Sequence, residues 1–280
     1  MMFSSHALAL LFIAEAFFGG ATVPAEYKKI KTGFGYVSVA PEDVPAAIDE
    51  GKAARLAAEK VFLLRNVTFG IVEEGSGDVR WGGTEYGLKT YTWTFPHGPR
   101  RFKPRPAITL LRHEIAHELF ARHLVPTTTD RQYGTDAPDW LDEMAAVAFE
   151  DSDRRSSRRR DAKNQGLLNL TALLRMTHPE LGAPVVREEG QAFAAGPVSS
   201  DRTIPFYATV SCLYEFLAEK SGNEGIVAEL ATAFNRGEDL ERWLPDRLGY
   251  DRRRESLEQM NADFLRWFAG KPRYSTPEQL

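Results

Sequence analysis

The sequence HEIAH at residues 113–117 most constrains what this 280-residue chain can fold into, because it lies in a run typical of a buried helix. On an α-helix, residues i and i+4 lie one turn apart on the same face. His113 and His117 are therefore expected side by side, where two imidazoles can bind one Zn²⁺. Glu114 then lies beside the first histidine, where it can act as the general base toward a metal-activated water. The pattern predicts a zinc hydrolase.

A catalytic zinc site usually has three protein ligands, and two residues are candidates for the third. His123 matches the metzincin spacing H-E-x-x-H-x-x-G-x-x-H, but Phe120 stands where that pattern has the glycine that permits a sharp turn. In an unbroken helix His123 points away from His117 and lies roughly 9 Å further along the axis. The other candidate is Glu143, on a helix that a short hairpin can bring against the HEIAH helix. The two candidates predict different classes of zinc enzyme.

The run WLDEMAAVAFE at residues 140–150 resembles the W-L-x-E-G-x-A-x-x-x-E signature of gluzincins. Together with HEIAH, it is most similar to the peptidase MA-like and aminopeptidase-type members of that clan. The resemblance implies that Glu143 is the third zinc ligand and that Glu150, seven residues later, holds a ligand imidazole in place. Met144 departs from the pattern, which usually has glycine at this position. The resemblance covers about residues 110–269.

Residues 204–222 resemble the helix that follows the zinc site in peptidase MA-like proteins and carries a tyrosine near its start. The resemblance implies that Tyr207 donates a hydrogen bond to the tetrahedral oxyanion, where a phenol stabilises the developing charge. Tyr207 shares a helix face with Tyr214, so a role in core packing is the alternative. The G-x-M-E-N segment by which the best-known aminopeptidases of this clan recognise an amine does not occur before HEIAH.

Hydrophobic periodicity predicts the elements around these motifs. Alternating and β-branched residues predict strands at residues 33–40, 66–74 and 84–95, and an Ala-rich amphipathic pattern predicts a helix at residues 43–64. Residues 79–81 read as the return of a hairpin. From residue 167 onward almost all of the chain reads as helix. The chain should therefore adopt an α+β fold, with a small, mainly antiparallel N-terminal sheet packed on the zinc-binding helices and a mostly helical C-terminal lobe.

These elements predict two lobes that make up one catalytic domain. Residues 26–150 would form the N-terminal α+β lobe with both ligand helices, and residues 164–280 the helical lobe. The charged run at residues 151–163, rich in arginine and serine, is interpreted as a solvated linker between the lobes. Substrate would lie between the lobes, extended along the strand at residues 84–95.

The N-terminus predicts secretion. Within residues 1–25 an apolar run precedes small residues, a pattern typical of a signal peptide cleaved after Ala21 or Ala25. Glu15 inside the run is atypical of such peptides, as is the lack of a preceding basic residue. The mature protein is expected in a secreted or periplasmic location, without stable insertion in a membrane.

Composition narrows the classes of partner. A net charge of −4 and a sequence pI near 5.9 argue against nucleic-acid binding. The single cysteine, Cys212, cannot form an intrachain disulfide and reads as a core residue. We expect a secreted zinc-dependent peptidase acting on peptide or protein substrates. The alternatives are a non-catalytic peptidase-like module that binds zinc and interacts with other proteins, and a metzincin-like endopeptidase that uses His123.

Overall fold

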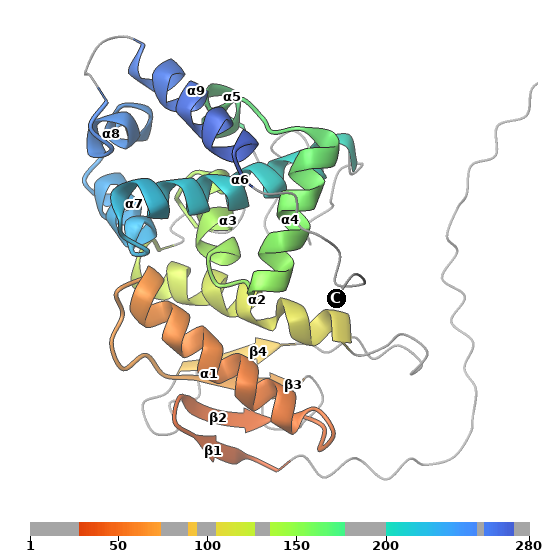
Figure 1. The fold of residues 1–280 in the computed structure, drawn as a ribbon. Helices are drawn as coiled ribbons and strands as arrows, with labels where there is room; N and C mark the ends of the chain where they lie inside the picture. Colours follow the sequence, from red (N-terminus) through yellow and green to blue (C-terminus); the bar gives the residue numbers. More distant parts are fainter. Residues whose placement is uncertain are drawn as a thin grey trace, which may run out of the picture.

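The computed structural model describes residues 28–73, 89–93, 105–126, 135–176, 200–250 and 255–271. Their elements, in chain order (Figure 1), are β1 (Ile30–Thr32), β2 (Gly35–Ser38), α1 (Val44–Val61), β3 (Phe69–Glu73), β4 (Lys89–Trp93), α2 (Arg105–His123), α3 (Asp139–Val147), α4 (Ser152–Gln165), α5 (Leu170–Leu174), α6 (Ser200–Ser221), α7 (Ile226–Asn235), α8 (Leu240–Arg247) and α9 (Ser256–Ala269). The predicted signal peptide and the predicted hairpin return at residues 79–81 lie outside the described residues. The fold is broadly α+β, as predicted.

The described sheet is mixed, so the prediction of a mainly antiparallel sheet is wrong. Its strands lie in the order β1-β2-β3-β4, with β1 antiparallel to β2. Strand β2 runs parallel to β3, with Gly35 opposite Phe69, and β3 runs parallel to β4, with Phe69 opposite Lys89. The reason is the helix between β2 and β3. A chain that crosses back through a helix enters the sheet again in the same direction.

The predicted strand at residues 33–40 begins inside the turn that joins β1 to β2. Gly35 opens β2 with a φ of +136°, and a Cβ at this position would lie 2.1 Å from the carbonyl oxygen of Phe69. Only glycine fits such a close approach of neighbouring strands. Within the predicted strand, residues 33–34 therefore form the turn and Gly35–Ser38 form β2, whereas β1 (Ile30–Thr32) precedes the predicted range.

Aromatic rings join the sheet and the first helices. Phe34 stacks on Phe69 with ring centroids 5.0 Å apart. Phe62, just after α1, lies 5.8 Å from the ring of Phe120 on α2 and 4.6 Å from that of Phe149 after α3. All five rings are buried. They fix α1, α2 and α3 against one another and lie within a single cluster of buried apolar side chains that also includes residues of α6 and α9.

Helix α2 runs without a break through Phe120. The backbone amide of Leu124 donates to the carbonyl oxygen of Phe120 at 2.9 Å, the bond of a regular helix. The last turn carries Arg122 and His123, basic residues that suit the negative end of the helix dipole. The helix therefore continues past Phe120, where the metzincin pattern has the glycine of a sharp turn.

The run at residues 151–163 is a helix, so its interpretation as a solvated linker is wrong. Asp151 begins α4 as its N-cap, accepting from the backbone amide of Arg154 at 2.8 Å. Arg155 and Arg159, one turn apart, lie 4.0 and 3.4 Å from the carboxylate of Glu215 on α6. Arg155 and Arg159 therefore pair with a neighbouring helix.

The C-terminal elements α5 to α9 are helical, as predicted; in Figure 1 α6 crosses beside α3 and α4, with α5, α8 and α9 above it and α7 toward the left. Phe216 of α6 contacts Phe264 and Trp267 of α9, at centroid distances of 5.5 and 5.7 Å. Cys212 is fully buried on α6, and burial raises the pKa of its thiol to about 12. In the described part of the chain, no helix has the length and apolar character needed to cross a bilayer.

Replacing Gly51 by alanine tests the packing of α1. In a helix interior this change normally stabilises by about 1 kcal/mol. Here the added Cβ would lie 2.2 Å from the buried ring of Phe34, which cannot swing away because it stacks on Phe69. We expect Gly51→Ala to lower the free energy of unfolding in urea by about 1–3 kcal/mol.

The exposed neighbour Lys52 provides a control, since Lys52→Ala should change stability by less than about 0.5 kcal/mol. Adding Phe34→Leu to Gly51→Ala should recover part of the loss by making room for the methyl group. A Gly51→Ala protein as stable as the original chain would show that the ring does not confine this position.

Candidate metal site

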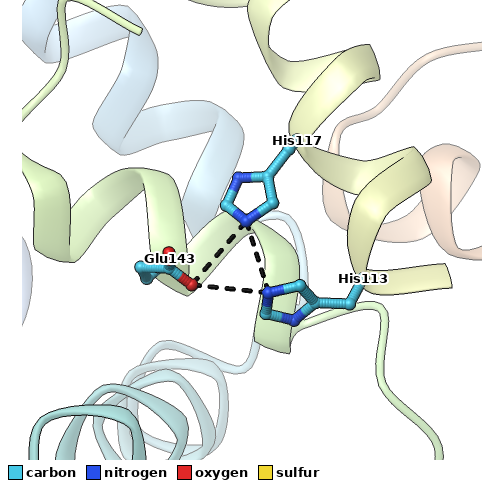
Figure 2. A group of neighbouring side chains, drawn as sticks. All are labelled: His113, His117 and Glu143. Atoms are coloured by element: carbon cyan, nitrogen blue, oxygen red, sulfur yellow. Dashed lines mark hydrogen bonds and ion pairs between the residues drawn. The ribbon is translucent and has the colours of Figure 1, made fainter. Parts of the chain in front are cut away.

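Helices α2 and α3 bring three ligand-bearing side chains together (Figure 2). His113 and His117 project from the same face of α2 toward Glu143 of α3, with their Nε2 atoms 3.3 Å apart. The Oε2 atom of Glu143 lies 3.5 Å from Nε2 of His113 and 3.7 Å from Nε2 of His117. Glu143 is fully buried, and the two histidines are at most one-fifth exposed. This cluster could hold a metal ion.

The triangle of ligand atoms has the size that tetrahedral coordination requires. Ligands placed about 2.0–2.1 Å from a Zn²⁺ ion at the corners of a tetrahedron are about 3.3–3.4 Å apart. The three observed distances between His113, His117 and Glu143 are close to this edge length. The donor set of two imidazoles and one carboxylate leaves a fourth corner for a non-protein ligand.

Each imidazole also contacts a carboxylate through its Nδ1 atom. Nδ1 of His113 lies 3.1 Å from Oε1 of Glu150, and Nδ1 of His117 lies 3.0 Å from Oδ1 of Asp142. The second oxygen of Asp142 accepts from the backbone amide of Thr135 at 2.9 Å. Carboxylates in these places favour a proton on Nδ1 and leave the Nε2 lone pairs for a metal.

Buried negative charge dominates the site. The carboxylates of Asp142, Glu143 and Glu150 are all buried, and Arg158 is the guanidinium buried with them. Burial lowers the pKa of His117, but its hydrogen bond to Asp142 and nearby carboxylate charges outweigh that effect and raise the pKa to about 9. The pKa of His113 is likewise raised, because bonds to Glu143 and Glu150 outweigh burial. Without a metal, protons on the imidazoles supply positive charge that a bound cation would otherwise provide.

Glu150 remains ionised in this setting. Burial acts to raise its pKa, but hydrogen bonds from Arg158 and His113 outweigh burial and lower the pKa to about 2. Arg158 donates from Nε to Oε2 of Glu150 at 2.7 Å and from its second nitrogen to Oε1. The imidazole that Glu150 contacts is that of His113.

Tyr207 lies at the same site, on α6. Its hydroxyl donates to Oε1 of Glu143 at 3.3 Å, and its ring centroid lies 6.3 Å from that of His113. The guanidinium of Arg158 lies over the tyrosine ring, 4.8 Å from its centroid. Tyr207 is thus placed against the ligand carboxylate in addition to packing near Phe206.

Of the two remaining candidates, Glu114 lies beside the site and His123 does not belong to the ligand cluster. Glu114 is half-buried beside the site, and its charge contributes to the raised pKa of His117. His123 is exposed at the end of α2, and among the described residues the ligand cluster consists of His113, His117 and Glu143 without it. Because α2 does not bend at Phe120, the metzincin arrangement is not formed.

Sequence reasoning missed two residues of the site. Asp142 stands directly before Glu143 in the run WLDE, and the requirement that each ligand histidine has a carboxylate partner was a signal for it. Arg158 lies in the charged run that was interpreted as a linker. The i, i+4 spacing of Arg154 and Arg158 was the available signal, since it places both side chains on one helix face.

No protein-family model, curated protein or solved structure matches this chain. Assignments of chemistry therefore depend on the site itself.

A graded series of variants tests the ligand assignment. Glu143→Ala should abolish tight binding of Zn²⁺, since only two ligands remain. Asp142→Asn should weaken binding about 10–100-fold, because one asparagine oxygen cannot accept from both His117 and the Thr135 amide. His123→Ala should bind Zn²⁺ with the affinity of the original chain. Competition with a chromogenic chelator measures all three, and loss of zinc from the His123 variant together with its retention in the Glu143 variant would reverse the assignment.

Proposed function

We propose that this protein is a zinc-dependent peptidase of the gluzincin type. The observation that carries the proposal is the triangle of His113 Nε2, His117 Nε2 and Glu143 Oε2, whose edges fit tetrahedral zinc with one open corner. The carboxylates behind both imidazoles support it, because they orient the ligands as catalytic zinc sites require. The resemblance of residues 140–150 to the gluzincin signature agrees with the same ligand set.

The chain's own residues would divide the chemistry among them. A bound Zn²⁺ supplies Lewis acidity and lowers the pKa of the attacking water. Glu114 takes the proton of that water and delivers it to the leaving amine. Tyr207 turns its hydroxyl from Oε1 of Glu143 toward the substrate oxygen as negative charge develops there. Glu150 and Asp142 hold His113 and His117 in position throughout.

The substrate side of the proposal follows from the sheet. β4 is the last strand in the described order, and an extended peptide that pairs with such a strand satisfies its own backbone hydrogen bonds. Peptides and proteins are the substrates that fit this mode of binding. We propose a secreted or periplasmic location for the enzyme on the pattern of residues 1–25 alone.

Glu114→Gln tests the reaction. The variant should retain zinc, because Glu114 is not a ligand, and should lower kcat for peptide hydrolysis by about 10²–10⁴-fold, because glutamine cannot accept the proton. Metal content by elemental analysis and turnover of a fluorogenic peptide mixture by the full chain are the two measurements.

Glu118→Gln is the matched control. Glu118 follows the second histidine as Glu114 follows the first, and it pairs with Arg122 of the same helix, so activity should survive. A chain that binds no zinc contradicts the proposal. A chain that binds zinc tightly but hydrolyses no peptide favours the non-catalytic module.

A further inference from the structure

The guanidinium of Arg158 contacts two residues that each bond to a candidate metal ligand. The Arg158 side chain, 17% exposed, donates to both oxygens of Glu150. On its other side it lies over the ring of Tyr207. An arginine serves both contacts because its plane carries a fork of donors at the edge and a stacking face.

The two contacts lead to ligands on different helices. Glu150 reaches Nδ1 of His113 on α2, at 3.1 Å. The hydroxyl of Tyr207 donates to Oε1 of Glu143 on α3 at 3.3 Å. The other carboxylate oxygen, Oε2, faces the imidazoles. Arg158 itself comes from α4, and Tyr207 from α6. The guanidinium of Arg158 therefore connects residues of four helices through Glu150 and Tyr207.

We propose that Arg158 is a positioning residue of the metal site, which sets the geometry of His113 through Glu150 and of Glu143 through Tyr207. The inference rests on the proposed metal site and adds a residue that the gluzincin resemblance does not include. Without Arg158, the buried carboxylate of Glu150 loses the bidentate partner that fixes its rotation, and the ring of Tyr207 loses the cation stacked on its face.

Lysine is not an adequate replacement. An ammonium can pair with one oxygen of Glu150, but it cannot present two parallel donors while stacking on the Tyr207 ring. Arg158→Lys should therefore keep the positive charge but lose the two parallel hydrogen bonds to Glu150 and the stacking on the Tyr207 ring. Removing a group that supports a ligand in this way typically weakens metal binding about 10–100-fold.

Arg159 provides a matched control on the same helix. Its side chain is 16% exposed, almost the same as that of Arg158, and it pairs with Glu215 of α6 at 3.4 Å. Glu215 contacts neither histidine. Replacing Arg159 removes an ion pair whose arginine is as buried as Arg158, and it reports the cost of disturbing the interface between α4 and α6 without changing a side chain of the metal site.

The experiment compares Arg158→Lys, Arg158→Gln and Arg159→Gln in the full chain. Zn²⁺ affinity and release rate are measured against a chelator, and the visible absorption spectrum is recorded after loading with Co²⁺, whose bands report ligand geometry. Urea unfolding of each metal-free protein gives its stability. We expect 10–100-fold weaker binding and an altered Co²⁺ spectrum for both Arg158 variants, and an unchanged affinity and spectrum for Arg159→Gln.

The possible outcomes are distinguishable. If the original chain binds neither ion, the proposed function fails together with the inference. If the original chain binds zinc and the Arg158 variants match Arg159→Gln in affinity and spectrum, the inference is overturned while the proposed function stands. Should Arg158→Gln not fold, Arg158→Lys decides alone, since it retains the charge in the interface.

Discussion

Burial of carboxylates beside two imidazoles is the constraint on which the rest of the structure depends. Three carboxylates in contact with His113 and His117 are withdrawn from water, and an ionised group in such a place requires positive partners. A cation between the ligand atoms can supply one part of that charge, and Arg158 supplies another. Because Arg158 comes from a separate helix, the electrostatic requirement of the site also determines where α4 must lie.

Helix α4 is held to the protein in an unusual way. Ala162 is the only buried residue of α4, so this helix presents almost no apolar face to the core. Four of its five arginines instead form two pairs at i, i+4 spacing. Arg154 and Arg158 face Glu150, whereas Arg155 and Arg159 face Glu215 on α6. A helix can therefore join a folded domain through arginines that pair with one buried carboxylate, Glu150, and one partly buried carboxylate, Glu215, while the aliphatic parts of its long side chains cover apolar surface.

These features explain what the sequence could and could not predict. His113 and His117 could be paired because helical spacing fixes their geometry within one element. Glu143 was named through the gluzincin resemblance of residues 140–150, and Phe120 argued against a bend toward His123 without excluding it. Asp142 and Arg158 escaped notice because their roles depend on how separate elements meet. The mixed sheet was missed for a different reason. The helix between β2 and β3 was predicted, and a crossover helix makes the two strands parallel, but the strands were expected to be mainly antiparallel.

The ring of Phe62 has a consequence for the site that it never touches. It lies between Phe120 on the back of the HEIAH helix and Phe149 at the end of the helix that carries Glu143. These rings act as a spacer that sets how far apart the two ligand-bearing helices stand. Because α2 also carries His113 and His117, and α3 carries Glu143, a change in the size of one of these apolar rings is expected to alter the distances between the three ligand atoms without any change to a ligand residue.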